Sequence, residues 1–220
     1  MNDPADASNG SNASNPRTLT LQQYVSDILT LETHIEEAID GQLRLADLQE
    51  HPGAVAALSR FHALVKNQRE AVRMHLNRLG GPPGGGLVST GQAMVKNAVT
   101  SAAGMAAGAI NTVRTQAVSK ALRDDYTAFN HAGVSYAMLL TTAQLLGDAE
   151  TVELAAWHLQ GYEGAIEEIA GLMPEVVAWE LRKDGLLVED KDVGAAAQRL
   201  GEIWRRPTRE GQEASAMAAG

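Results

Sequence analysis

The segment between residues 20 and 46 repeats apolar side chains at intervals of three and four residues, with one acid inside the repeat. Its members are Leu21, Val25, Ile28, Glu32, Ile35 and Ile39. This spacing puts all of these side chains on one face of an α-helix, whereas the faces of a strand alternate at every second residue. A carboxylate on a buried face is unfavourable unless another group pairs with it or coordinates it. Glu32 therefore indicates either a polar network or a metal ligand inside a helical protein.

The same helical spacing recurs along most of the 220 residues, and no segment shows the alternation of a strand. Helices are expected at about residues 20–46, 55–79, 92–146, 149–184 and 185–206. Gly147 should end the third of these helices, and Asp148 should cap the fourth. The first should begin near Thr20, because Thr20 and Gln23 have the spacing of a capping box. The third is either continuous or broken near Gly104 or Gly108, since a glycine destabilises a helix interior by about 1 kcal/mol. The sequence therefore predicts an all-α protein.

Glycine, proline and polar residues divide the chain. The run GGPPGGG begins a hinge at residues 80–91, which no helix can cross. An Ala/Gly-rich inserted helix is expected at 92–122, within a helical bundle that covers 18–184. The polar stretches 1–17 and 207–220 have the composition of disordered tails. The first stretch has neither the basic nor the apolar region of a secretory signal, and we expect a cytoplasmic protein.

The chain has no cysteine, which excludes disulfides and thiolate metal sites, and its formal net charge is −9. Residues 71–123 nevertheless contain no acid and several Lys and Arg. We expect this stretch to face something anionic, either the chain's own acidic helices in an oligomer or a partner. Nucleic acid is not the expected partner, because no basic face with interleaved aromatic residues is evident. The absence of a phosphate-loop ending or a nucleophile–base pair argues against an enzyme.

Small residues form one face of the expected inserted helix. They include Ala102, Gly104, Ala106 and Gly108. Such a face lets two helix backbones approach closely, so we expect it to form the interface of a homo-oligomer. Two other interpretations are open. The segment is a flexible lid over the bundle, or its uncharged residues 97–113 touch a membrane, although they are short and polar for a membrane span.

Two motifs lie in the flanking helices. Tyr136 is followed eleven residues later by Gly147, and a helix of alternating acidic and apolar residues comes next. The earlier helix pair ends in the pattern His-x-x-Arg-Leu, at His75, Arg78 and Leu79.

On these motifs, roughly residues 20–80 and 120–180 resemble ferritin-like proteins, in particular the small bacterial stress-associated group of the YciF type. The resemblance implies a ferritin-like four-helix bundle. The bundle would carry the inserted Ala/Gly-rich helix between its two helix pairs, and an extra helix at the C-terminal end. It also implies that the core holds a di-iron or similar carboxylate site, built from two Glu and two Glu-x-x-His motifs.

The ligands of such a site are incomplete in this chain. It contains no Glu-x-x-His motif, because Val72 and Ala155 stand where a Glu would precede His75 and His158. The acid that the family carries before the motif tyrosine is replaced by Ala132. Iron oxidation needs metals bridged by carboxylates, so these losses favour a protein without a metal cofactor.

The inward-facing candidates that remain for metal ligation are Glu32, His75 and Glu163, with Glu167 one turn beyond Glu163. We expect an oligomeric, non-catalytic ferritin-like protein, tied to bacterial stress or metal homeostasis only by the resemblance. The alternative is a ferroxidase-like or redox protein that binds iron or manganese at an atypical site made of these four residues.

A purely structural role for Glu32 also stays open. In that interpretation, Glu32 accepts hydrogen bonds from Gln68, His75 or Tyr136 on facing helices, because buried polar groups nearly always have partners. Tyr136 and Tyr162 are expected in the core, with their hydroxyls in the polar network. His158 is expected at the flank of its helix.

Overall fold

The computed structural model describes residues 15–82 and 116–205, and all regular elements in these residues are α-helices. The helices are α1 Pro16–Gln42, α2 Ala46–Gln49, α3 Pro52–Arg78, α5 Ala117–Leu146, α6 Ala149–Lys183 and α7 Asp190–Arg205. This part of the chain contains no strand, which confirms the all-α prediction. The predicted small-residue face at 102–108 and the candidate membrane segment 97–113 lie outside the described residues.

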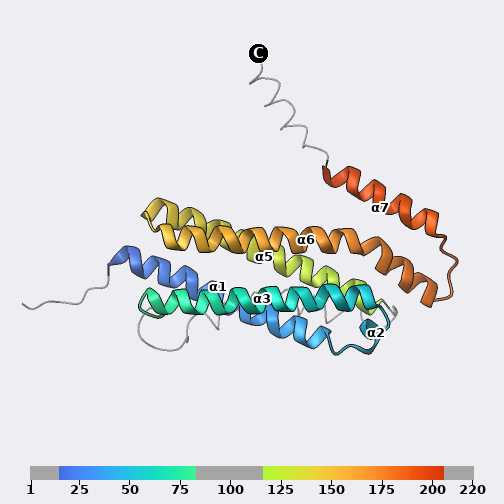
Figure 1. Ribbon diagram of the computed structural model, residues 1–220, viewed down its shortest axis with the longest axis horizontal. Helices are drawn as coiled ribbons and strands as arrows, with labels where there is room; N and C mark the ends of the chain where they lie inside the picture. Colours follow the sequence, from blue (N-terminus) through green and yellow to red (C-terminus); the bar gives the residue numbers. More distant parts are fainter. Residues whose placement is uncertain (1–14, 83–115, 206–220) are drawn as a thin grey trace, which may run out of the picture.

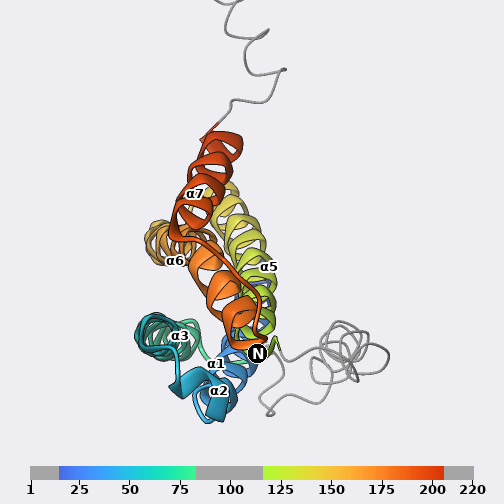
Figure 2. The same ribbon diagram turned by 90° about the vertical axis from the view of Figure 1, so that its right-hand side faces the viewer.

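The four long helices α1, α3, α5 and α6 lie side by side (Figure 1). In the end-on view of Figure 2, α3 and α6 lie on one side and α1 and α5 on the other. The contacts agree with this arrangement, since α1 packs on α3 and α5, and α6 packs on α5 and α3. The apolar faces of the four helices therefore meet in one shared core, as helix amphipathicity requires.

Hydrogen bonds between the helices give their directions. Gln22 Nε2 donates to the Leu79 carbonyl at 2.6 Å, so the start of α1 lies beside the end of α3. Gln42 Nε2 donates to Asp125 Oδ1 at 2.9 Å, so the end of α1 lies beside the start of α5. Neighbouring helices are thus antiparallel, and α3 and α5 run in the same direction. The chain leaves α3 at one end of the bundle and enters α5 at the other (Figure 1).

The first helix begins earlier than the sequence predicted. Asn15 is its N-cap, and the Asn15 side chain accepts a hydrogen bond from the Arg17 backbone N–H at 3.1 Å. Pro16 occupies the first turn, where its missing N–H costs nothing. The predicted capping box is wrong: the Thr20 hydroxyl lies inside the helix and donates to the Pro16 carbonyl instead. An Asn-Pro start is as good a helix signal as a capping box.

The turn between α5 and α6 follows the sequence prediction. Gly147 ends α5 with φ of 74°, a left-handed conformation that glycine adopts without strain. Asp148 then caps α6 by accepting a hydrogen bond from the Thr151 backbone N–H at 2.9 Å. At the other end of this helix pair, Glu180 of α6 accepts hydrogen bonds from the backbone N–H groups of Val118 and Ser119 at 2.9 and 3.0 Å. A carboxylate is favourable there because the first N–H groups of a helix have no partner within it.

The core is apolar along most of the bundle. Its fully buried members include Val25, Leu58, Val65, Phe129, Leu139, Ala155 and Ile169. The rings of Phe61 and Phe129 meet edge to face, with centroids 5.4 Å apart. Helices α3 and α6 approach closely at Gly161, where an added Cβ would lie 2.6 Å from Gln68 Nε2.

Helix α7 lies outside the four-helix arrangement, beyond a turn at the end of α6 (Figure 1). Most of its residues are exposed, and Trp204 keeps 61 % of its surface in solvent while its ring lies 6.1 Å from that of Tyr126. No helix in residues 15–82 or 116–205 is both long and apolar enough to cross a membrane.

Candidate functional site: a buried carboxylate between two tyrosines

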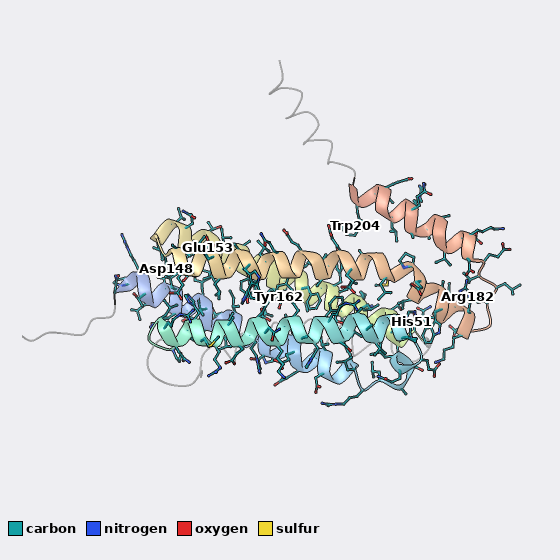
Figure 3. The ribbon with its side chains drawn as sticks, in the orientation of Figure 1. His51, Asp148, Glu153, Tyr162, Arg182 and Trp204 are labelled. Carbon is teal, nitrogen blue, oxygen red and sulfur yellow. The ribbon has the colours of Figure 1, made fainter. Side chains whose placement is uncertain are left out.

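Glu32 lies in the middle of α1 and has no exposed surface. Its two carboxylate oxygens accept one hydrogen bond each from tyrosines of the facing helices. The Tyr136 hydroxyl of α5 donates to Oε1 and the Tyr162 hydroxyl of α6 donates to Oε2, both at 2.6 Å. Figure 3 shows Tyr162 halfway along the bundle, between the helix pairs. The bonds have the short length typical of hydroxyls bound to a charged acceptor, and they join three of the four long helices.

A second layer surrounds these three residues. His158, one turn before Tyr162 on α6, places Nδ1 2.7 Å from the Tyr136 hydroxyl oxygen. Its other ring nitrogen, Nε2, is buried without a hydrogen-bond partner. Gln68 of α3 donates from Nε2 to the His158 backbone carbonyl at 3.1 Å. All four long helices therefore contribute to one polar cluster inside an apolar core.

Burial sets the charge states of the cluster. It raises the pKa of Glu32 to about 7, against the two tyrosine hydrogen bonds, which lower it, and the nearby charge of Glu36, which raises it slightly further. No ion pair in the described residues includes Glu32, and Glu36 pairs instead with Arg69 at 2.9 Å. The carboxyl is therefore protonated in a substantial fraction of molecules at neutral pH.

The partners of Glu32 stay neutral near pH 7. Burial, followed by the charge of Glu32, raises the pKa of Tyr136 and Tyr162 well above 10. Burial, followed by His75, lowers the pKa of His158 to about 4. Glu32 is thus the group of this cluster whose charge changes near neutrality.

His75 belongs to a different polar group near the end of α3. It is buried, and its Nε2 lies 2.7 Å from the Thr151 hydroxyl of α6. Its Nδ1 lies 3.3 Å from an Arg78 guanidinium nitrogen and 3.6 Å from a Glu150 carboxylate oxygen. Burial lowers the pKa of His75. It forms no hydrogen bond with Glu32. Of the three partners expected for Glu32 in the structural interpretation, only Tyr136 forms a hydrogen bond with it.

The structure does not bring the predicted metal ligands together. Glu163 and Glu167 are exposed on α6, although Glu163 was predicted to face the core. The reason is helical phase: Tyr162 occupies the inward position, and the next residue is turned by about 100°. Residues 15–82 and 116–205 contain no group of three or more His, Asp or Glu side chains that could hold a metal ion. Both oxygens of Glu32 are bound to hydroxyls, and the other predicted ligands lie apart from it. The predicted ligands therefore do not fit the carboxylate-bridged metal pair that the resemblance implies.

His158 is the member of this cluster that the sequence prediction placed wrongly, at the flank of its helix. Its position could have been read from the spacing, because Thr151, Ala155, His158 and Tyr162 have the three- and four-residue spacing of one helix face. The structure buries all four of these residues. A histidine on that face should have been expected inside the bundle rather than at its flank.

A second buried carboxyl lies near the other end of α1. Asp125 of α5 accepts a hydrogen bond from Gln42 Nε2 through Oδ1, while its Oδ2 has no partner. Burial raises the pKa of Asp125 to about 7. Nothing in the sequence singles out this residue, because it follows another acid, Asp124, in a polar segment.

Grooves on the surface do not reach the cluster. A groove of about 440 Å³ lies between α6 and α7, and its lining includes Tyr126, Glu167 and Trp204. Another, of about 560 Å³, lies between α1 and α3 beside Thr33 and Arg73. Neither is lined by Glu32 or its tyrosines, so the cluster has no opening to a small-molecule substrate through these grooves.

Comparisons with protein-family models, with curated proteins and with solved structures find no match for this chain.

Proposed function

We propose that this chain is a non-catalytic bundle of ferritin-like type whose core position for metal ligands is occupied by a carboxylate–tyrosine network. The observation that carries the proposal is the state of Glu32. Each of its oxygens receives a 2.6 Å hydrogen bond from a tyrosine, and the other predicted acids lie on the surface. The network holds α1 against α5 and α6 in one register, which is the best-attested role of a buried polar group.

The helix directions support a ferritin-like arrangement. Neighbouring long helices are antiparallel, and the connection from α3 to α5 has to traverse the whole length of the bundle. One long crossover between two helix pairs distinguishes ferritin-like bundles from simple up-and-down bundles. A role in bacterial stress or metal homeostasis follows only from the sequence resemblance and is part of the proposal on that ground.

Metal analysis tests this proposal. Protein purified from cells supplemented with iron and manganese should carry neither metal in stoichiometric amount. The substitutions Glu32→Ala and Glu163→Ala should leave the metal content equally low. About two metal ions per chain, lost on Glu32→Ala, would overturn the proposal in favour of the ferroxidase-like alternative.

Self-association is the second part of the proposal, and the outer face of α5 supports it. Val134, Met138 and Leu145 keep 62, 51 and 82 % of their surface exposed. No Asp, Glu, Lys or Arg occurs between Asp125 and Asp148. Two chains of net charge −9 repel each other least where such an uncharged apolar face is shared.

Light scattering of the purified protein checks this part, and the expected mass is a multiple of 23.3 kDa. Met138→Lys should dissociate the oligomer and lower the mass measured in solution. Thr127→Lys, at an exposed position nearer the start of α5, should leave that mass unchanged. A monomeric wild type would refute self-association and leave the proposal for Glu32 intact.

A further inference from the structure

The Tyr136 hydroxyl lies between two groups, each of which can accept its proton. Glu32 Oε1 is 2.6 Å away on one side and His158 Nδ1 is 2.7 Å away on the other. A phenol has one proton to donate and an oxygen that accepts, so it can donate to only one of these neighbours at a time. Whichever neighbour does not receive the tyrosine proton must itself donate to the tyrosine oxygen.

When Glu32 is ionised, one arrangement satisfies all of these contacts. Tyr136 donates to Oε1 and Tyr162 donates to Oε2. His158 is then neutral with its proton on Nδ1, from which it donates to the Tyr136 oxygen. The lone pair of the buried Nε2 has no partner.

A second arrangement contains one more proton. The proton binds at Nε2 of His158, Nδ1 passes its own proton to the Tyr136 oxygen, and Tyr136 passes its hydroxyl proton to Glu32 Oε1. Glu32 is now a neutral acid that donates to Tyr136, and Tyr136 donates to Nδ1. No charge remains in the cluster, and every hydroxyl proton still has an acceptor. Among Glu32, the two tyrosines and His158, the only group left without a partner is the Nε2–H of His158.

Protonation of Glu32 on Oε2, the oxygen that faces Tyr162, leaves more groups without a partner. If Glu32 carried the proton on Oε2 and donated to Tyr162, the Tyr162 hydroxyl proton would lose Glu32, its only hydrogen-bond acceptor among the described residues. This arrangement leaves two buried groups without a partner, the Tyr162 hydroxyl proton and the Nε2 lone pair of His158, whereas the second arrangement leaves only the Nε2–H. The presence of His158 behind Tyr136, and of no such group behind Tyr162, makes the two tyrosines unequal.

The other titratable and charged groups around the cluster do not compete for this proton. Glu36 of α1 is paired with Arg69 of α3. His75 of α3 is hydrogen-bonded to Thr151 and is held neutral by burial. Helix α5 contributes no charged side chain between Asp125 and its end.

We propose that Glu32, Tyr136 and His158 form a one-proton relay, in which protonation of Glu32 reverses the Tyr136 hydrogen bond and moves the ring proton of His158 from Nδ1 to Nε2. The relay rests on the proposed function, because it requires a Glu32 that holds no metal. It adds a proton-linked change of state to a network that would otherwise be only structural. The raised pKa of Glu32 and the lowered pKa of His158 agree with it, since they place the added proton on the acid.

Nitrogen NMR of the whole protein, labelled with ¹⁵N-histidine, tests the relay through the tautomer of His158. The resonance is assigned as the one missing from His158→Gln. In the wild type, His158 should change from the Nδ1–H to the Nε2–H tautomer as the pH falls, with a midpoint near the pKa of Glu32, about 7. In Glu32→Gln the tautomer should no longer depend on pH in this range.

The two tyrosines supply a matched pair of variants. Both are fully buried and both donate to Glu32, so Tyr136→Phe and Tyr162→Phe remove equivalent hydroxyls. The tautomer change should persist in Tyr162→Phe and disappear in Tyr136→Phe. A wild-type tautomer that stays constant between pH 5 and pH 9, or one that still changes in Tyr136→Phe or Glu32→Gln, would overturn the relay.

Metal content measured on the same sample separates the two proposals. Bound iron or manganese would refute the proposed function. Metal-free protein with an unchanging His158 tautomer would refute the relay alone.

Discussion

Two buried carboxyls of this protein have the same raised pKa but different surroundings. Glu32 and Asp125 each titrate near pH 7 because burial disfavours their charge. Glu32 has a donor on each oxygen, whereas Asp125 has a single donor from Gln42 and an Oδ2 without a partner. The pKa alone therefore does not reveal whether a buried acid stabilises the fold. Whether the acid stabilises the fold depends on how many hydrogen-bond donors have it as their acceptor.

The largest effect is expected when the acid of the satisfied network is removed. Glu32→Ala leaves two buried tyrosine hydroxyls without their acceptor and opens a cavity, so it should lower the free energy of unfolding by about 3–5 kcal/mol. Urea denaturation followed by circular dichroism measures the loss. Glu163→Ala, on the exposed face of α6, is the control and should change stability by less than about 0.5 kcal/mol. A loss below about 1 kcal/mol for Glu32→Ala would show that the tyrosines find other partners.

Changing the pH should separate the charge of Glu32 from its hydrogen bonds. A carboxyl whose pKa is raised from 4.5 to about 7 on folding stabilises the protein fully below pH 4.5 and loses this contribution as the pH rises through 7. The stability of the wild type, measured relative to Glu32→Gln, should therefore fall by about 2 kcal/mol between pH 5 and pH 8. Measuring the difference cancels the titrations that both proteins share, including those of His75 and His158. A difference that does not change with pH would mean that Glu32 has its ordinary pKa.

The outer layer of the network can be disturbed without touching its acid. Gly161→Ala would place a Cβ 2.6 Å from Gln68 Nε2, which donates to the His158 carbonyl. We expect a loss of about 1–2 kcal/mol, because the amide has to move away from its acceptor. Gly164 lies one turn further along and has no atom near its added Cβ. Gly164→Ala should therefore stabilise the protein by up to about 1 kcal/mol through helix propensity. Equal effects of the two substitutions would show that the close approach of α3 and α6 does not matter.

Substitution of Asp125, which has a donor on only one of its oxygens, should change stability the least. The change should be opposite in sign to that caused by substituting Glu32. Asp125→Asn keeps an oxygen for Gln42 and removes a buried charge, so at pH 8 it should stabilise the protein by about 1 kcal/mol or less. Glu32→Gln at the same pH should be destabilising, because its amide nitrogen faces a tyrosine that has been donating. Thermal unfolding of both variants at pH 8 tests the contrast. If both variants shift the midpoint in the same direction, the number of donors does not distinguish the two acids.

The sequence predicted those features that depend on the phase of a single helix. The stripe from Leu21 to Ile39 placed Glu32 in the core, and the Gly147–Asp148 pair marked the end of α5 and the start of α6. Both predictions needed only the helical repeat and the chemistry of helix ends. The same repeat placed Tyr162 inward on α6, and applied to its neighbours it would also have placed Glu163 outward and His158 beside the core.

Which of the candidate residues bind Glu32 could not be decided in this way. Tyr136 is 104 residues and Tyr162 130 residues distant along the chain, and their contact with Glu32 depends on how α5 and α6 are shifted along α1. One turn of sliding would exchange these partners for others of similar character. Gln68 illustrates the ambiguity: it lies on the expected face of α3, yet it binds a backbone carbonyl of α6 rather than Glu32.

The antiparallel pairs α1–α3 and α5–α6 each join helices that are near in sequence, through residues 43–51, which include α2, and through residues 147–148. The Glu32 hydrogen bonds instead cross between the pairs. Each pair can form from contacts that are near in sequence, while docking one pair on the other requires closure of the long connection between them. The tyrosine bonds should then be made after the rate-limiting step of folding. We therefore expect Glu32→Gln to speed unfolding and to leave the refolding rate nearly unchanged in stopped-flow measurements, and slower refolding would contradict this order. If only unfolding becomes faster, the buried acid determines how long the folded bundle lasts rather than how quickly it forms.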